Sequence, residues 1–311
     1  MSPQFRPGLI RVPKPKGEKV RVPDYSLKVV AYVAEVLSED TDAEAVDRVA
    51  TGFFVNIPSR VIPNMWFAYF VTAKHVAMDL QKKRSTVIIN TKDGGVTTLK
   101  MLPTWWPHPN DDTVDVAVTP CIIEPTYDIM AIPESLFITP EIATKASLGI
   151  GDEIFMVGLF SAAPGVSRNQ PIVRIGNIAM LPQERIQVEG RFSEVHLVEA
   201  RSIGGMSGSP VFINKLAYTR QILPDGTDSF DQRGNIWFFG LTHGHWDVRE
   251  ADINSPTFIQ DRQRGVNMGI AVVVPAHKIL EAINHPHLVA MRAAMEAAAI
   301  KQVSPEPDVE R

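Results

Sequence analysis

The most informative part of the sequence is "SIGGMSGSPVF", residues 202–212, in which three glycines and three serines stand directly before an apolar run. A serine hydroxyl attacks a carbonyl well only when a base removes its proton and donors stabilise the oxyanion. Backbone N–H groups serve as donors when they converge on one small concavity, which requires conformations that glycine adopts readily. We therefore predict Ser207 as the nucleophile, with the amides of Gly205 and Ser207 as the oxyanion hole. Gly204 and Gly208 are expected to leave room for substrate, and Pro210 to fix the start of the next strand.

A serine nucleophile needs a base, and the base needs a carboxylate that orients it. Among the eight histidines, His75 has the suitable setting in "YFVTAKHVA" (69–77), where an apolar strand ends beside small residues. Asp115 stands at the head of an apolar strand in "NDDTVDVAV" (110–118). Asp111 and Asp112 lie in the preceding polar loop, where we expect both to be solvated. The predicted catalytic residues are His75, Asp115 and Ser207.

Two series of short β-rich segments surround these residues. The first covers 28–36, 49–57, 65–73, 85–90, 96–101 and 115–120, and the second covers 152–160, 171–180, 185–190, 194–201, 209–214, 236–244 and 268–275. Many short strands separated by turns indicate closed or sandwiched antiparallel sheets. Helices are predicted only near the end of the chain, over 276–283 and 287–302. The histidine and aspartate fall in the first series and the serine in the second, so we expect a cleft between two β-domains.

The sequence divides into four predicted parts. These are a basic, proline-rich N-terminal arm (1–25), a first β-barrel with the histidine and aspartate (26–130), a second β-barrel with the serine (131–276), and C-terminal helices and tail (277–311). The arm contains five prolines and six Lys or Arg residues, a composition typical of extended, solvated chain. Binding of an acidic partner to its basic run is the alternative. The connections 215–235 and 247–267 are long for loops between strands, and we interpret them either as lids or docking surfaces or as solvated hairpins.

Three motifs, in this order, resemble those of the trypsin/chymotrypsin-like serine peptidases: "TAKHV" (72–76), "DVAV" (115–118) and "GMSGSPVF" (205–212). The resemblance covers roughly residues 28–285 and implies an all-β fold of two six-stranded antiparallel barrels with C-terminal helices. It also implies cleavage of peptide bonds through an acyl-enzyme, without a cofactor. The Ser-Pro ending of the turn looks closest to the glutamyl-endopeptidase-like and other disulfide-free bacterial branches. Met206 stands where many secreted members carry an aspartate that pairs with a newly freed N-terminus, so we expect no such activation switch.

The same resemblance gives an expectation for specificity. Arg201 takes the family position at the base of the pocket for the side chain before the scissile bond, and "GLTHGHW" (240–246) supplies the strand that lines it. An acidic residue is therefore the predicted preference at that position. Two alternatives stay open: Arg201 points to solvent or pairs with Glu199, and His243 contacts Asp115 instead of substrate. The predicted substrate-binding residues are Arg201, Thr242, His243 and His245.

Composition limits the other classes of function. The chain has 311 residues, a net charge of −4 and a single cysteine, Cys121, which excludes an internal disulfide and favours a reducing, cytoplasmic setting. The sequence contains no run of 18 apolar residues, so no membrane span is predicted. The mild acidity of the chain gives no overall case for nucleic-acid binding. The expected partner is a polypeptide substrate.

Competing chemistries fit the sequence less well. An α/β-hydrolase esterase needs G-x-S-x-G on a strand-to-helix elbow and the opposite order of catalytic residues. Neither "HGH" (243–245) nor "HPH" (285–287) provides the three or four ligands that zinc requires, so no metal is predicted. The remaining rival is a catalytically silent protein of the peptidase fold that binds a peptide in its cleft.

Overall fold

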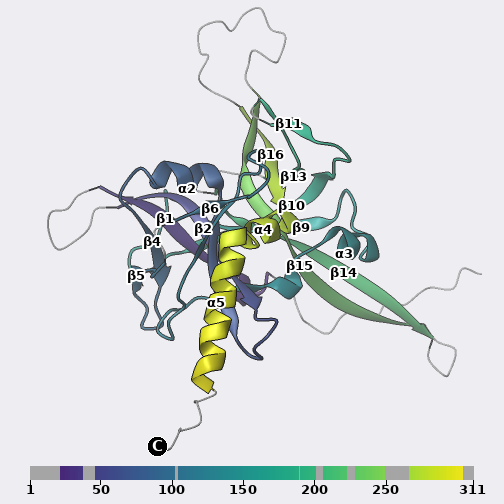
Figure 1. Ribbon diagram of the computed structural model, residues 1–311. Coiled ribbons are helices and arrows are strands. Elements are labelled where there is room, and N and C mark those ends of the chain that lie inside the picture. The colour runs from purple at the N-terminus through teal and green to yellow at the C-terminus, as the bar shows by residue number, and fades with distance from the viewer. Residues whose placement is uncertain are drawn as a thin grey trace, which may run out of the picture.

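The computed structural model describes residues 22–37, 46–101, 104–188, 190–200, 206–222, 228–248 and 266–303. Strands dominate these residues, and they gather into two bodies that lie side by side (Figure 1). The predicted domain boundaries stay predictions, and residues 1–21 of the predicted arm lie outside the described residues.

The first sheet contains the strands of the N-terminal half. Its path runs β5-β4-β1-β2-β3-β7-β6, with β8 paired in parallel to β2 and the other pairs antiparallel. Two of its strands, β6 and β8, were not predicted, because two residues are too few to show an alternating pattern. The strands are β1 (Val30–Val36), β2 (Val46–Pro58), β3 (Trp66–Thr72), β4 (Ser85–Asn90), β5 (Val96–Thr98), β6 (Trp106–Pro107), β7 (Ala117–Pro120) and β8 (Ile132–Pro133).

The C-terminal half forms a closed barrel in the order β10-β13-β16-β15-β14-β9, which leaves no free strand edge in it. A separate hairpin, β11–β12, connects two of its strands. The all-β, chymotrypsin-like fold class predicted from the sequence is confirmed. Of the two predicted six-stranded antiparallel barrels, the C-terminal one is present as a closed barrel, whereas the N-terminal strands form an eight-stranded sheet, because the short strands β6 and β8 add to it. The strands are β9 (Glu153–Leu159), β10 (Pro171–Met180), β11 (Ile186–Val188), β12 (Arg191–Ser193), β13 (His196–Glu199), β14 (Pro210–Ile222), β15 (Asp228–Val248) and β16 (Val266–Pro275).

The two predicted C-terminal helices are present, and α5 runs away from the barrel toward the C-terminus (Figure 1). The short helices α1, α2, η1 and α3 were not predicted, although the buried residues Val76, Ala77 and Leu80 of α2 follow helical spacing. None of the helices that the structure describes is long and apolar enough to cross a membrane. The helices are α1 (Asp24–Leu27), α2 (Lys74–Leu80), the 3-10 helix η1 (Glu134–Leu136), α3 (Pro140–Lys145), α4 (Ala276–Ile283) and α5 (Pro286–Val303).

One of the two long connections is not a loop. Of the interpretations offered for 215–235, the structure has the hairpin: β14 and β15 continue as an antiparallel ribbon from the pair Lys215–Asn235 to the pair Ile222–Asp228. Antiparallel pairing is made by the backbone, so a ribbon can extend without an alternating apolar pattern in its sequence. The ribbon projects from the barrel in Figure 1. Most of the other connection, residues 249–265, lies outside the described residues.

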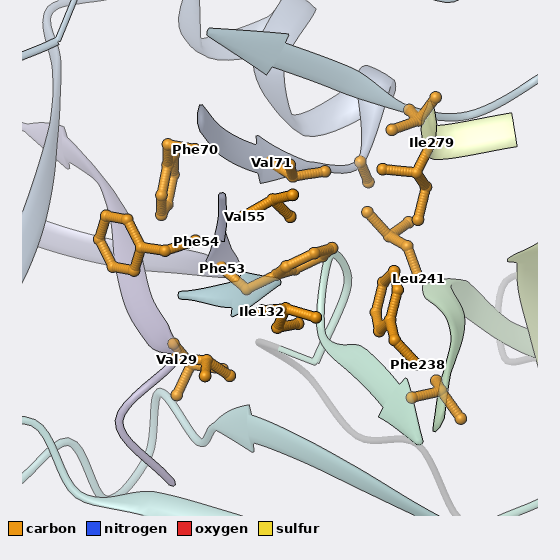
Figure 2. Packing of buried hydrophobic residues seen from close by; sticks show 14 of the residues in the cluster. Val29, Phe53, Phe54, Val55, Phe70, Val71, Ile132, Phe238, Leu241 and Ile279 are labelled. Carbon is orange, nitrogen blue, oxygen red and sulfur yellow. The ribbon is translucent and has the colours of Figure 1, made fainter. Parts of the chain in front are cut away.

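A single hydrophobic core joins the two bodies. The Phe53 ring of β2 lies 5.3 Å from the Phe238 ring of β15, and Phe137 packs against Phe238 at 4.7 Å. All three side chains are almost completely buried. Figure 2 shows Phe53 and Phe238 pointing toward one another, with Ile132 between the elements that carry them. Aromatic contacts of this kind bury large apolar areas and therefore fix the first sheet against the barrel.

Candidate active site

His75 is placed by the junction of β3 and α2. The chain leaves β3 at Thr72 and begins α2 at Lys74, so His75 lies in the first turn of the helix. Its backbone N–H donates to Asp115 Oδ1 at 2.8 Å, and its side chain is 49% exposed. The ring lines a cavity of about 300 Å³ together with Asp115 and His243. His75 therefore combines a fixed backbone with a side chain that solvent or substrate can reach.

Asp115, which is 8% exposed just before β7, joins the two histidines. Its Oδ2 lies 2.8 Å from His75 Nδ1 and 2.5 Å from His243 Nδ1. Burial alone raises the pKa of this carboxyl, but hydrogen bonds from His243 and then from His75 outweigh it, so the pKa falls well below its usual value. An ionised carboxylate only accepts hydrogen bonds, so both Nδ1 atoms donate. This leaves His75 Nε2 with the lone pair that a general base needs.

For His243, on β15, the sequence left two roles open: contact with substrate and contact with Asp115. Its side chain is 17% exposed, and its ring lies 5.3 Å from that of His75 at an interplanar angle of 71°. The structure shows the contact with Asp115, the alternative to substrate binding. The contribution of His243 to a specificity pocket stays a prediction.

The Ser207 turn is bonded to both bodies of the fold. Thr51 of β2 donates its N–H to the Ser207 carbonyl at 3.0 Å, and Gly208 donates to the Thr242 carbonyl of β15 at 2.8 Å. Thr242 in turn donates to the Ser209 carbonyl at 2.9 Å. No hydrogen bond joins the Ser207 hydroxyl to His75 among the residues that the structure describes. Such contacts are often long in unliganded enzymes and tighten when substrate binds.

The predicted oxyanion hole of Gly205 and Ser207 stays a prediction. Within the described residues no carbonyl accepts the Ser207 N–H, as an oxyanion donor requires. Residues 201–205 lie outside the described residues, and with them the predicted roles of Arg201, Gly204 and Gly205. Nothing is described of the His245 side chain.

The prediction that Gly208 leaves room for substrate is wrong. Gly208 has φ +82°, and a Cβ there would lie 2.1 Å from the Thr51 carbonyl oxygen and 2.5 Å from Thr72 Oγ1. Thr72 Oγ1 itself donates to that Thr51 oxygen at 2.8 Å. The missing side chain therefore allows the turn to pack closely against β2 and β3, directly before His75.

The neighbours of the turn are buried. Met206 is fully buried, as is typical of an apolar side chain that forms no ion pair. Pro210 begins β14 as predicted. Thr242 is also fully buried, and its Oγ1 has no hydrogen-bond partner among the described residues. Its observed contribution is the pair of backbone bonds to the Ser207 turn, whereas its contact with substrate stays a prediction.

The loop before Asp115 differs from the expectation at one residue. Asp111, predicted to be solvated, has a side chain only 12% exposed that accepts hydrogen bonds from Thr113 and pairs with Arg185. Burial raises the pKa of Asp111, but the contacts with Thr113 and Arg185 lower it by more, so the pKa lies below its usual value. Asp112 is solvated as predicted, with a side chain 84% exposed that lies 3.3 Å from Arg191. Arg185 directly precedes the β11–β12 hairpin and Arg191 belongs to it. The hairpin therefore forms a wall of the cavity, which the sequence did not reveal.

The site also contains a possible set of metal ligands that the sequence did not suggest. One ligand atom from each of His75, Asp115 and His243 lies within 4.8 Å of the others. Two imidazoles and a carboxylate are a donor set that zinc accepts. In the sequence, the motif "HGH" suggests a metal site of His243 with His245. It gives no reason to add His75, which stands 168 residues earlier. In the observed arrangement Asp115 Oδ2 accepts the Nδ1–H groups of both histidines.

No protein-family model matches the chain, and neither does any curated protein. Two solved structures are similar at 15% identity. The protease domain of MamO from Magnetospirillum magneticum, in its apo form, has a TM-score of 0.40 and covers 68% of this chain and 94% of its own. Rv3671c from M. tuberculosis H37Rv, a serine-to-alanine mutant in its inactive form, has a TM-score of 0.42 and covers 84% of this chain and 86% of its own.

Proposed function

We propose that the protein is a serine endopeptidase. The observation that carries the proposal is the buried Asp115 carboxylate, which accepts both the backbone N–H and the Nδ1–H of His75. This arrangement fixes the tautomer in which Nε2 can act as a base. The Ser207 turn, bonded to β2 beside the start of α2, supplies the nucleophile.

In the proposed reaction, Ser207 Oγ attacks the scissile carbonyl and His75 Nε2 takes the hydroxyl proton. Asp115 stabilises the imidazolium that forms, and the Ser207 and Gly205 N–H groups bind the oxyanion. His75 then gives its proton to the leaving amine, which yields an acyl-enzyme. Water, activated by the same imidazole, attacks the ester, releases the acyl product and restores Ser207.

Specificity and setting are proposed from the sequence. Arg201 and His245 support a preference for an acidic residue before the scissile bond, as in the glutamyl-endopeptidase-like branch. The engagement of His243 with Asp115 removes one of the three cations from that argument. A cytoplasmic location is proposed because Cys121 is the only cysteine. Burial raises the pKa of Cys121 to about 12, so its thiol stays protonated and takes no part in the chemistry.

The experiment that tests the proposal uses a fluorophosphonate probe, which reacts only with an activated serine. We expect the wild-type protein to be labelled and Ser207→Ala to remain unlabelled. Ser209→Ala is the matched control, because it removes a hydroxyl from the same turn and should keep its label. An unlabelled wild-type protein, or equal labelling of Ser207→Ala, would show that Ser207 is not an activated nucleophile.

One observation favours a second function. Among the described residues the Ser207 hydroxyl makes no hydrogen bond to His75, which a protein that holds peptides without cutting them would also show. Such a module would bind the same peptide with equal affinity as wild type and as Ser207→Ala, and neither protein would release a cleavage product. Titration with a fluorescent peptide, followed by mass spectrometry of the mixture, distinguishes the two functions.

A further inference from the structure

We propose that His108 and Glu281 are positioning residues of the active site, and that together they hold the loop that carries Asp115. The inference rests on the proposed function, because it assigns a role to two residues that act through its catalytic carboxylate. His108 directly follows β6 and begins the loop that ends at Asp115, whereas Glu281 lies on α4. The sequence analysis predicted neither residue as part of the site.

The His108 ring organises the start of the loop. Its side chain is almost completely buried, and its Nδ1 accepts the backbone N–H groups of Asn110 at 3.3 Å and of Asp111 at 3.1 Å. A ring nitrogen that accepts hydrogen bonds carries no proton, so the proton of this imidazole is on Nε2. Nε2 lies 2.8 Å from Glu281 Oε2 and donates to it. Glu281 therefore stabilises the tautomer on which both loop hydrogen bonds depend.

Glu281 joins this loop to the other body of the fold. Burial raises the pKa of its carboxyl, but the hydrogen bond from His108 and the contacts with Lys278 lower it by more, so the pKa lies below its usual value. Lys278 Nζ lies 3.2 Å from Glu281 Oε1 and 3.2 Å from Glu194 Oε2. Because α4 directly follows β16 of the barrel and also packs against β7, the contact with His108 ties the loop to both bodies.

Hydrogen bonds continue from the His108 end of the loop to the catalytic carboxylate. The Asp111 carbonyl accepts the Val114 N–H at 3.3 Å, and the Asp111 side chain accepts the N–H and the hydroxyl of Thr113. Asp115 directly follows this turn, so its carboxylate moves with the backbone of the loop. Catalytic rates depend steeply on the placement of such groups. Loss of the contact between His108 and Glu281 should therefore displace Asp115 and slow the reaction.

Substitutions of Glu281 test the contact with little risk to folding, because its side chain is 44% exposed. Glu281→Ala removes the acceptor of the His108 Nε2–H, whereas Glu281→Gln keeps a carbonyl oxygen that can accept it. Glu124→Ala is the matched control. Glu124 is exposed to a similar extent, forms an ion pair with Lys100 at 2.7 Å and lies outside the loop.

The first measurement is the reaction of Ser207 with the fluorophosphonate probe, whose limiting rate and half-saturating concentration are determined separately. We expect Glu281→Ala to lower the limiting rate about 10–100-fold and to change the half-saturating concentration less than about twofold, because a displacement of about 1 Å at a catalytic group costs about 100-fold. Glu281→Gln should recover most of the lost rate. Glu124→Ala should react at the wild-type rate.

The second measurement does not depend on catalysis. His75 donates its backbone N–H to Asp115 Oδ1 at 2.8 Å, so hydrogen exchange of this amide, followed by NMR in Ser207→Ala, reports the placement of Asp115. Adding Glu281→Ala should accelerate this exchange about tenfold, while the amides paired between β9 and β10 keep their rates. Unchanged exchange of the His75 amide would overturn the inference. Equal acceleration at all amides would also overturn it, because it would show only a general loss of stability.

The outcomes separate the inference from the proposed function. If the wild-type protein does not react with the probe but Glu281→Ala selectively accelerates exchange at His75, the positioning of Asp115 stands and the peptidase proposal falls. If wild type and Glu281→Ala react at equal rates, the peptidase proposal stands and the inference falls.

A substitution of His108 tests the contact from its other side. His108→Asn keeps a side-chain oxygen that can accept the N–H groups of residues 110 and 111, as asparagine does in turns, but its side chain is too short to reach Glu281. We expect it to reproduce the slower labelling and the faster exchange at His75. If Glu281→Ala does not fold, this variant decides by the same two measurements, and wild-type values of either would overturn the inference.

Discussion

Replacing Gly208 by alanine tests whether the nucleophile turn is pressed against the first sheet. Gly208 has φ +82°, a backbone conformation that an L side chain resists. The added Cβ would lie 2.1 Å from the Thr51 carbonyl oxygen and 2.5 Å from Thr72 Oγ1. The Thr51 oxygen belongs to the backbone of β2, so no rotamer change can move it away. Either the turn or the strand must shift.

The expected loss of stability has two parts. The positive φ costs about 1–2 kcal/mol for a residue with a Cβ, and overpacking of a tight contact costs about 1–3 kcal/mol more. Gly94 provides a matched control, because it has φ +94° and nothing lies within 4 Å of its Cβ position. Gly94→Ala should therefore show only the first part. The difference between the two substitutions, about 1–3 kcal/mol, measures the contact of the turn with β2.

Two assays report the result. Urea unfolding should give a lower midpoint for Gly208→Ala than for Gly94→Ala, at an unchanged slope. Labelling by the fluorophosphonate probe should slow about 100-fold in Gly208→Ala, because a shift of about 1 Å at a reacting group costs that much. Gly94→Ala should label at the wild-type rate. Equal midpoints and equal labelling rates for the two variants would refute the packing of the Ser207 turn against β2.

Three further substitutions test the site and the core. Asp115→Asn should lower kcat by about 10⁴-fold, because the amide no longer holds His75 in the right tautomer. The pKa of Asp115 is lowered in the folded protein, so its carboxylate stabilises the fold above the unfolded value of about 3.9 and this contribution is lost as the pH falls further. The difference in Tm between wild type and Asp115→Asn should then shrink below about pH 4. Burial lowers the pKa of His196 to about 4, and its Nδ1 has no partner among the described residues. The free energy of unfolding should therefore fall by on the order of 3 kcal/mol as the pH falls from about 6.5 to 4. His196→Phe should abolish this loss in urea titrations at several pH values, and persistence of the loss would assign it to other groups. Phe238→Ala should cost about 3–5 kcal/mol in the same assay, because its ring packs between both sheets.

Much of the fold could be predicted from the sequence because its strands are short, apolar and separated by turn residues. The segment 171–180 matches β10 residue for residue, and 276–283 matches α4. The failures have physical causes. Strands of two residues carry no periodicity, α2 follows a strand without a capping residue, and the β14–β15 ribbon extends through backbone pairing rather than an apolar face.

The site could be predicted as far as its residues belong to ordered motifs. His75 and Asp115 meet as expected, because both lie at the ends of neighbouring strands of one sheet, β3 and β7. The sequence could not choose between the two roles of His243, because a side chain on a strand can face the triad or the pocket. The prediction that Asp111 is solvated was wrong, because its partner Arg185 stands 74 residues later. Contacts between separate segments leave no local pattern in a sequence.

The position of Ser207 depends on the contact between the two bodies of the fold rather than on either body alone. Its turn is held by Thr51 from the first sheet and by Thr242 from the barrel, while the base and its carboxylate come from the first sheet and His243 comes from the barrel. A substitution that loosens this contact therefore moves the nucleophile relative to the base before it unfolds either body. Because reactivity depends steeply on such distances, labelling of Ser207 should fall at a lower urea concentration than that at which the strands unfold. Coincident loss of labelling and of β-structure would show instead that the two bodies and the site form one cooperative unit.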